Sequence, residues 1–147
     1  MIDLEPLRQT LGASDPWIES RGTHWLNPDT LSIRELTVAM NAVGARFVTI
    51  TAYELAGTQG FRLEYHWDLK GRLLGFPFAI SGNTFQSIYD LCEAADWIER
   101  EVHEGFGIEF TGREYEPLLL RAGDKTGVNL RETKAPAAAP AQKEVAK

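Results

Sequence analysis

Residue types that could hold a metal ion are few and scattered along this 147-residue chain. The three histidines, His24, His66 and His103, are far apart, and the one cysteine leaves no Cys-x-x-Cys pair. Glu99 and His103 are four residues apart in a segment with helical spacing, so both could grip one ion from the same helix face. A metal site needs a third ligand, which the spacing does not supply. A solvated or salt-bridged helix face is therefore the favoured interpretation.

Candidates for acid–base or nucleophilic chemistry are equally weak. Glu99 and Glu101 are two residues apart on a predicted helix, so their carboxylates point in different directions. Cys92 precedes that helix, where the helix dipole could lower the pKa of its thiol, but no histidine stands beside it in the sequence. A small buried hydrophobic side chain is the favoured role for Cys92. Gly105-Phe106-Gly107 follows a helix instead of opening one, so it indicates a helix end and not a phosphate loop.

The segment from Ala94 to Phe110 combines large apolar side chains with charges. It places Trp97 and several other apolar residues beside Glu99-Arg100-Glu101. Anchors that become buried and charges that fix the register are the chemistry of a specific docking surface. The alternative is a single amphipathic helix that closes the protein's own core, and composition alone favours that alternative.

Residue periodicity predicts the elements that would position this segment. Ser32 and Glu35 fit a capping box, and apolar residues follow with helical spacing up to Gly44. Residues 46–54 are rich in β-branched and aromatic side chains and predict a strand. Two further strands alternate apolar with other residues at a period of two. Their apolar positions are Phe61, Leu63, Tyr65 and Trp67 in the first, and Leu74, Phe76, Phe78 and Ile80 in the second.

These three strands predict an antiparallel meander, with Pro77 at a free edge or a break because proline cannot donate to a ladder. Residues 85–91 predict a fourth extended segment. A second helix begins near Ala94 and ends at Gly105 and Gly107. The predicted fold class is α+β, a small antiparallel or mixed sheet of three to four strands with helices packed on one face.

The two ends of the chain differ from this centre. Residues 1–29 predict an N-terminal segment, with a short helix up to Gly12 followed by a loop over residues 14–29. That loop contains two tryptophans, which usually lie against a core or a partner. Residues 132–147 are rich in alanine and carry two prolines, so they predict a flexible tail. The remaining residues, 30–131, predict the α+β domain.

Composition excludes several classes of protein. Hydrophobic residues make up 44% and charged residues 24% of the chain, as in an average soluble domain. No apolar run reaches the roughly 18 residues of a membrane span, and the N-terminus lacks the features of a signal peptide. The formal net charge of −6 disfavours nucleic acid as a partner. A lone cysteine cannot form an internal disulfide, which suits a reducing cytosol.

The segment around residue 100 resembles a family signature. Glu99-Arg100-Glu101, Phe106-Gly107-Ile108 and Phe110-x-Gly112 follow in the order and spacing found in the thirty-kilodalton subunit of NADH:quinone oxidoreductase, which is respiratory complex I. Thr51-Ala52-Tyr53 and Ser87-Ile88-Tyr89-Asp90-Leu91 resemble weaker motifs of the same family. The resemblance spans residues 30 to 131.

This resemblance implies a fold, a role and an assembly. The family fold is α+β, and the family's subunit binds no NADH, flavin, quinone or iron–sulfur cluster itself. The sequence agrees, since it has neither a cluster-binding cysteine set nor a dinucleotide loop. The chain would be a non-catalytic structural subunit in the hydrophilic arm of a membrane-bound oxidoreductase. It would lie peripherally at the cytoplasmic face of the inner membrane, held there through its partner subunits.

The implied partners carry the redox chemistry. They would be a large catalytic, hydrogenase-like subunit and iron–sulfur subunits, which hold the iron–sulfur clusters and a nickel–iron or quinone site. Arg113-Glu114 stand where the family usually has His-Pro, and Glu104-Gly105 replace an aspartate and a bulky residue. These departures favour the related subunits of energy-converting nickel–iron hydrogenases and formate hydrogenlyases. The alternatives are the thirty-kilodalton subunit of a conventional NADH:quinone oxidoreductase, a stand-alone small binding module, and an enzyme in its own right.

The residues expected to carry docking lie on and after the second predicted helix. Glu99 and Glu101 would bracket Arg100, either to fix a subunit interface or to stabilise the subunit's own fold. The full set of predicted interface or motif residues is Trp97, Glu99, Arg100, Glu101, Phe106, Gly107, Ile108, Phe110 and Gly112.

Overall fold

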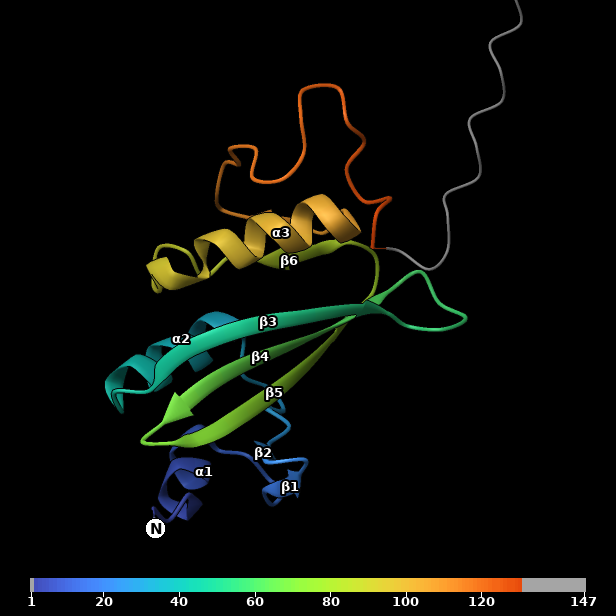
Figure 1. Cartoon of the computed structure of the whole chain (residues 1–147). Coiled ribbons are helices and arrows are strands. Elements are labelled where there is room, and N and C mark those ends of the chain that lie inside the picture. The colour runs from blue at the N-terminus through green and yellow to red at the C-terminus, as the bar shows by residue number, and fades with distance from the viewer. Residues whose placement is uncertain (1, 131–147) are drawn as a thin grey trace, which may run out of the picture.

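The computed structural model describes residues 2–130 of the chain (Figure 1). The predicted flexible tail, residues 132–147, lies outside the described residues. In the described part, no helix is both long enough and apolar enough to cross a bilayer. The elements in chain order are α1 (Glu5–Leu11), β1 (Ile18–Ser20), β2 (Thr23–Trp25), α2 (Ile33–Ala42), β3 (Arg46–Glu54), β4 (Phe61–Leu69), β5 (Arg72–Ile80), β6 (Thr84–Gln86), the short 3-10 helix η1 (Glu93–Ala95), α3 (Asp96–Phe106) and β7 (Glu109–Thr111).

The strands form one mixed sheet and one small parallel pair (Figure 1). The mixed sheet has five strands in the order β1-β2-β5-β4-β3. Its β2–β5 pair is parallel and its other pairs are antiparallel. Strands β6 and β7 pair with each other in parallel. The predicted α+β class is confirmed, although the main sheet has five strands where the sequence predicts three to four.

The centre of the sheet is the predicted antiparallel meander of β3, β4 and β5. Tyr65 in β4 lies between Ile50 in β3 and Phe76 in β5. The odd-numbered residues of β4 are buried, and most of the even-numbered ones are only half-buried on the opposite face. Strand β2 pairs with β5 only as far as Gly75. Pro77 therefore lies where one edge of β5 has no neighbouring strand in the described part, which confirms its predicted position.

One hydrophobic core joins the sheet to the three α-helices. Helix α1 contributes Leu7 and Leu11, α2 contributes Leu36 and Met40, and α3 contributes Val102. Each fully buried aliphatic side chain of this size contributes about 1.5–3 kcal/mol. These side chains join the odd-numbered residues of β4 in one cluster, so the helices pack on one face of the sheet, as predicted.

Helix α2 begins at the predicted capping box. The Glu35 N–H donates to the Ser32 hydroxyl at 3.2 Å, and the Ser32 N–H donates to the Glu35 carboxylate at 2.8 Å. Two N–H groups that the helix cannot satisfy internally are thereby paired. Helix α1 ends just before Gly12, which adopts a φ of +67°. The predicted short helix up to Gly12 and the predicted helix that begins after Ser32 are therefore both confirmed.

The predicted loop over residues 14–29 is wrong in part, because β1 and β2 form a hairpin there. Strand β2 joins the main sheet through β5, and the Trp25 ring lies directly over Gly75. Trp17 packs edge-on against Phe76 and donates its indole N–H to the Leu4 carbonyl at 3.0 Å. Both tryptophans thus lie against the folded protein. The strands have three residues each, too short for a local alternating pattern to reveal them.

The predicted fourth strand over residues 85–91 is also wrong in part. The chain is extended only over Thr84–Gln86, and this β6 strand pairs with β7 instead of joining the meander. Residues 87–91 turn away because the Glu99 carboxylate binds the Ser87 hydroxyl and the Ile88 N–H. The hydrogen bonds that the buried Glu99 carboxylate requires therefore outweigh the local preference of residues 87–91 for an extended chain.

We predict that Gly75→Ala destabilises the protein by about 1–3 kcal/mol, the usual cost of overpacking. A Cβ atom at Gly75 would lie 2.6 Å from the Trp25 ring, so the ring would have to move. Urea unfolding measures the change in free energy. In a Trp25→Ala background the same substitution should cost much less. Equal costs in the two backgrounds would show that the Trp25 contact is not the cause.

Candidate functional site

Glu99, the first charged residue of the predicted motif, is fully buried. Its carboxylate accepts hydrogen bonds from the Ser87 hydroxyl at 2.7 Å, the Ile88 N–H at 2.8 Å and Arg113 Nη1 at 3.0 Å. A buried charge is tolerated when it is paired and its oxygens are hydrogen-bonded. Glu99 therefore ties α3 to the turn after β6 and to the segment after β7.

Arg113 is the cation of this buried cluster, and its side chain is only 4% exposed. Its guanidinium bridges the carboxylates of Asp96 and Glu99. The guanidinium carbon also lies 4.8 Å from the ring centre of Tyr89 and 5.0 Å from that of Tyr115. Arg113 thus combines charge-assisted hydrogen bonds with attraction to two aromatic rings.

The pKa values of Asp96 and Arg113 move in the directions that keep both groups charged. Burial tends to raise the pKa of Asp96, but hydrogen bonds from Arg113 and Arg100 outweigh burial and hold the pKa below its ordinary value. Burial tends to lower the pKa of Arg113, but its bonds to Asp96 and Glu99 outweigh burial and raise that pKa. Asp96 and Arg113 therefore remain an ion pair at neutral pH.

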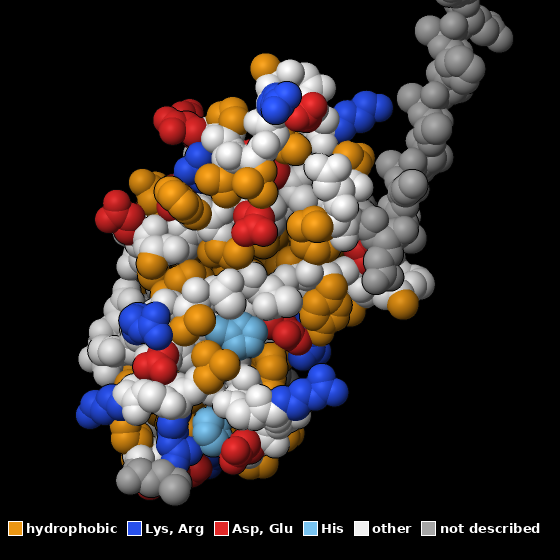
Figure 2. All heavy atoms as spheres, in the orientation of Figure 1, with side chains coloured by type: hydrophobic (Ala, Val, Ile, Leu, Met, Phe, Trp, Pro, Cys, Tyr) orange, Lys and Arg blue, Asp and Glu red, His pale blue; other side chains and the backbone are white. Residues whose placement is uncertain are grey.

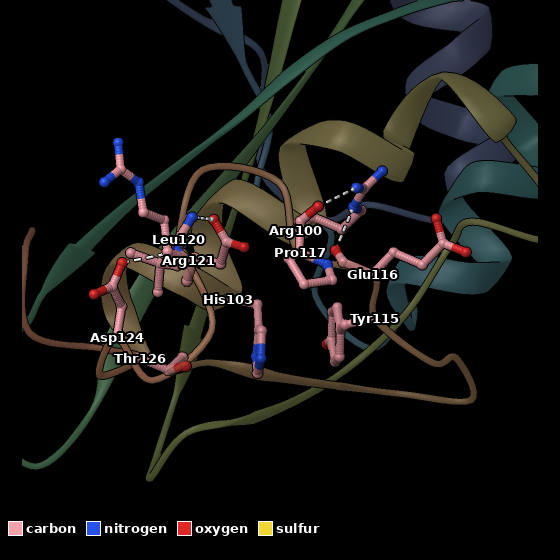
Figure 3. Close-up of a pocket in the computed structure, with 10 residues that line it drawn as sticks. Arg100, His103, Tyr115, Glu116, Pro117, Leu120, Arg121, Asp124 and Thr126 are labelled. Carbon is pink, nitrogen blue, oxygen red and sulfur yellow. Dashed lines mark hydrogen bonds between the residues drawn. The ribbon is translucent and has the colours of Figure 1, made fainter.

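Arg100 is not held between Glu99 and Glu101, so that part of the sequence prediction is wrong. Successive residues of a helix point in different directions, and Glu99 faces inward while Glu101 is exposed. Arg100 Nη1 lies 3.2 Å from the carboxylate of Asp96, one helical turn earlier. Its Nε and Nη2 each donate at 3.0 Å to carbonyl oxygens of residues 116–117 (Figure 3).

Glu104 fastens the C-terminal strap, the irregular segment of residues 112–130, to α3. Its buried carboxylate accepts the backbone N–H groups of residues 118–120 at 2.7 to 3.2 Å. Burial tends to raise the pKa of Glu104, but these hydrogen bonds outweigh burial and lower the pKa below its ordinary value. The Glu104 carbonyl oxygen also accepts the Gly127 N–H at 2.8 Å.

His103 and Tyr115 join the strap to α3 through a ring stack. The two rings lie nearly parallel with centroids 3.8 Å apart (Figure 3). His103 Nδ1 lies 2.9 Å from the Ile108 carbonyl oxygen, and the Tyr115 hydroxyl accepts the Phe110 N–H at 2.5 Å. Burial raises the pKa of Tyr115 to about 12. His103 and Glu99 thus have separate partners, and the ion-binding pair that their spacing allows does not form.

Glycines bring the end of the strap back against α3. Gly107 ends the helix with a φ of +75°, and a Cβ atom on Gly127 would lie 2.9 Å from the Gly107 Cα. The two backbones touch, which requires glycine there. The predicted helix end is confirmed at Gly107, whereas Gly105 lies inside α3 against Leu130. Gly112, with a φ of +86°, opens the strap.

The other predicted motif residues divide into buried and exposed groups. Ile108 and Phe110 belong to the core, and Phe106 is half-buried at its edge. Trp97 is 70% exposed, and Glu101, four residues later, is exposed as well. The motif therefore contains both structural residues and residues free to meet another molecule.

The site offers little for catalysis. A hollow of about 220 Å³ lies between α3 and the strap, below the roughly 300–1,000 Å³ of small-molecule pockets. Arg100, Glu104 and Tyr115 line it, and each is already hydrogen-bonded. Within residues 2–130, no three His, Cys, Asp or Glu side chains converge as metal ligands. Burial raises the pKa of the Cys92 thiol, opposite to the lowering that a helix dipole could give.

The partners that α3 binds in the strap do not follow from the pattern of residues along the chain. Arg113 and Glu104 stood out only as departures from a family pattern, and Tyr115 did not stand out at all. Charge balance was the available signal, because residues 89–118 hold nine acidic residues against two arginines. This excess of acid makes an arginine pair one way to satisfy a buried α3 carboxylate, as Arg113 does for Glu99, while backbone N–H groups satisfy Glu104.

We predict that Arg113→Ala lowers the free energy of unfolding by about 3–5 kcal/mol, because it leaves Glu99 buried without its cation. Chemical denaturation of the isolated chain measures the change. Glu101→Ala is the matched control on the exposed side of the helix, where the change should stay within about 0.5 kcal/mol. Wild-type stability of the Arg113→Ala variant would contradict the buried ion pair.

We predict that Glu104→Gln destabilises the protein at pH 7 by about 1–3 kcal/mol. A carboxyl group whose pKa is lower in the folded state stabilises above its unfolded pKa, near 4.5, and this contribution is lost as the pH falls through the folded pKa. The difference between variant and wild type should therefore shrink below about pH 4.5. Unfolding followed from pH 7 downward tests this, with Glu101→Gln expected to follow wild type throughout. A difference that stays constant with pH would count against the pairing.

A family model and a curated relative match parts of this chain. The model of the family described as "Respiratory-chain NADH dehydrogenase, 30 Kd subunit" matches residues 30–138. NAD(P)H-quinone oxidoreductase subunit J of Synechococcus sp. (strain WH7803) is 46% identical over 46 residues. Those residues are 31% of this chain and 25% of the relative, so the match spans only a quarter of the relative's length.

Two solved structures share the fold of this chain. The trypsin-resistant fragment (1-134) of Nqo5 gives a TM-score of 0.60 at 20% identity, over 77% of this chain and 98% of that one. A chain of the membrane-bound sulfane sulfur reductase, described as an archaeal respiratory membrane complex, gives 0.72 at 19% identity, over 91% of this chain and 84% of that one. At these identities the likeness shows the fold alone. Because the family model covers more than half of the sequence, this chain belongs to the thirty-kilodalton subunit family of respiratory-chain NADH dehydrogenase.

Proposed function

We propose that this protein is a non-catalytic structural subunit in the hydrophilic arm of a membrane-bound oxidoreductase related to complex I. Membership of the thirty-kilodalton subunit family is the observation that carries the proposal. The use of charge on α3 supports it, since Glu99, Arg100 and Glu104 all bind other parts of the same chain. Glu99 and Arg100, two of the three charged residues of the motif, thus serve the architecture of the subunit, as expected of a scaffold.

The proposed mechanism is to hold neighbouring subunits in register. Three side chains of α3, Glu99, Arg100 and Glu104, bind the strap and the turn after β6, which makes one ordered unit from three separate segments. Such a unit presents its exposed side chains to a partner with little ordering cost on binding. Electrons would travel through the iron–sulfur clusters and the nickel–iron or quinone site of the partner subunits. The chain would lie peripherally at the cytoplasmic face of the membrane.

Among complexes of this kind, an energy-converting nickel–iron hydrogenase or a formate hydrogenlyase is the first candidate. Its support is Arg113-Glu114 in place of the His-Pro that the resemblance leads one to expect. Arg113 is not an incidental change, because it neutralises the buried Glu99. A conventional NADH:quinone oxidoreductase is the second candidate, favoured by the local identity to a subunit J of an NAD(P)H-quinone oxidoreductase.

Affinity purification of the tagged chain from gently solubilised membranes tests the proposal. We expect it to bring down a large catalytic subunit and at least one iron–sulfur subunit, while the chain purified alone carries neither iron nor flavin. Hydrogen-dependent dye reduction by the captured complex would favour the hydrogenase type, and NADH-dependent quinone reduction the conventional type. Recovery of the chain without partners, or with a redox centre of its own, would contradict the proposal.

A further inference from the structure

One side of α3 faces away from the rest of the protein. Trp97 and Glu101 lie four residues apart in α3, the repeat that aligns side chains on one helix face. Glu93 lies in η1, the 3-10 helix that leads into α3, and all three side chains are exposed. We call these three residues the outer stripe. Trp97, at 70%, is the most exposed of the large hydrophobic side chains in the described part of the chain. An exposed indole offers a partner a large apolar area to bury.

The outer stripe stands on a fixed base. Asp96, which precedes Trp97, is bound by both Arg100 and Arg113. Glu99, two residues after Trp97, is held by Arg113 and the turn after β6. The backbone that carries the indole is therefore already ordered before a partner arrives. An anchor on an ordered helix loses little conformational entropy when it binds.

The surroundings of the indole are acidic. Arg100 and Arg113, the two arginines nearest in sequence, are paired with Asp96 and Glu99. Within residues 2–130, no ion pair joins Glu93 or Glu101 to a basic side chain. Figure 2 shows acidic and hydrophobic side chains lying beside one another over α3. The apolar anchor is thus accompanied by negative charge that nothing in the described chain neutralises.

This charge selects the kind of partner. In a two-fold dimer the same patch faces itself, so a second copy would bring acidic stripes together. An anionic lipid surface would repel the stripe as well. A protein surface with positive charge would gain attraction at the rim and apolar burial at the centre.

We infer that Trp97 inserts into an apolar pocket on another subunit, whose rim carries lysine or arginine side chains that face Glu93 and Glu101. This inference rests on the proposed function, because it names the chemistry of a partner within the same complex. It gives the two kinds of side chain separate tasks: the indole sets how long the complex lasts, and the carboxylates set how fast it forms.

Binding of purified variants to the remaining complex tests the indole. The complex is purified from cells that lack this chain, and association and dissociation are followed on a sensor surface. Trp97→Ala should weaken binding at least about thirty-fold, mainly through faster dissociation. Ile18→Ala is the matched control, because Ile18 is 62% exposed on β1 and outside the outer stripe. It should bind as wild type does.

The carboxylates are tested by charge reversal. The double variant Glu93→Lys and Glu101→Lys should lower the association rate about tenfold at low salt and much less at about 0.5 M salt, where charges are screened. Glu19→Lys, an exposed position on β1, is the matched control and should associate as wild type does. An unchanged association rate in the double variant would overturn the basic rim.

The remaining outcomes separate this inference from the proposed function. All variants should keep the thermal midpoint of wild type, since each substituted side chain is exposed. If wild type binds the complex and Trp97→Ala binds equally well, the inference is overturned while the proposed function stands. If wild type binds no part of the complex, both are overturned. Trp97-dependent dimerisation, or Trp97-dependent binding to phosphatidylglycerol vesicles, would also overturn the inference.

Discussion

The buried carboxylate of Glu99 is the constraint on which the arrangement of α3, the turn before it and the C-terminal strap depends. A charge with no exposed surface must be met by donors that the chain brings to it. Ser87 and Ile88 come from before α3, and Arg113 comes from after β7. One side chain therefore determines where the chain turns after β6 and where the C-terminal strap begins. The rest of the strap follows, because Arg113 places it within reach of Arg100 and Glu104.

The elements that the sequence predicts well are those with local causes. Ser32 and Glu35 cap α2 through bonds within one turn, and the alternation from Phe61 to Trp67 needs only a sheet with one buried face. The hairpin β1–β2 depends instead on a long-range fit, in which Gly75 leaves room for the Trp25 ring. Such a fit involves two residues far apart in the chain, and neither residue indicates it alone.

The candidate site shows the same division between local and long-range causes. Periodicity and the family resemblance both indicate α3 as the functional segment. Along the sequence, Glu99 and Glu101 stand on either side of Arg100, which predicts that the three side chains interact. Successive helical residues are rotated by about 100°, so the triplet separates in space. Glu99 turns inward, Arg100 follows the strap, and Glu101 meets solvent. The partner that completes the cluster, Arg113, has no local pattern that would reveal its role.

The grip of Glu104 on the strap has a consequence for how this region can vary among relatives. Glu104 recognises the peptide N–H groups of residues 118–120, and Leu119 leaves its own side chain 69% exposed. Drift in side-chain identity at position 119 therefore costs this contact nothing, whereas proline there would remove a donor. Pro117 is compatible because the neighbouring Arg100 uses its carbonyl oxygen. At position 119, selection should therefore act on the main chain and hardly at all on the type of side chain.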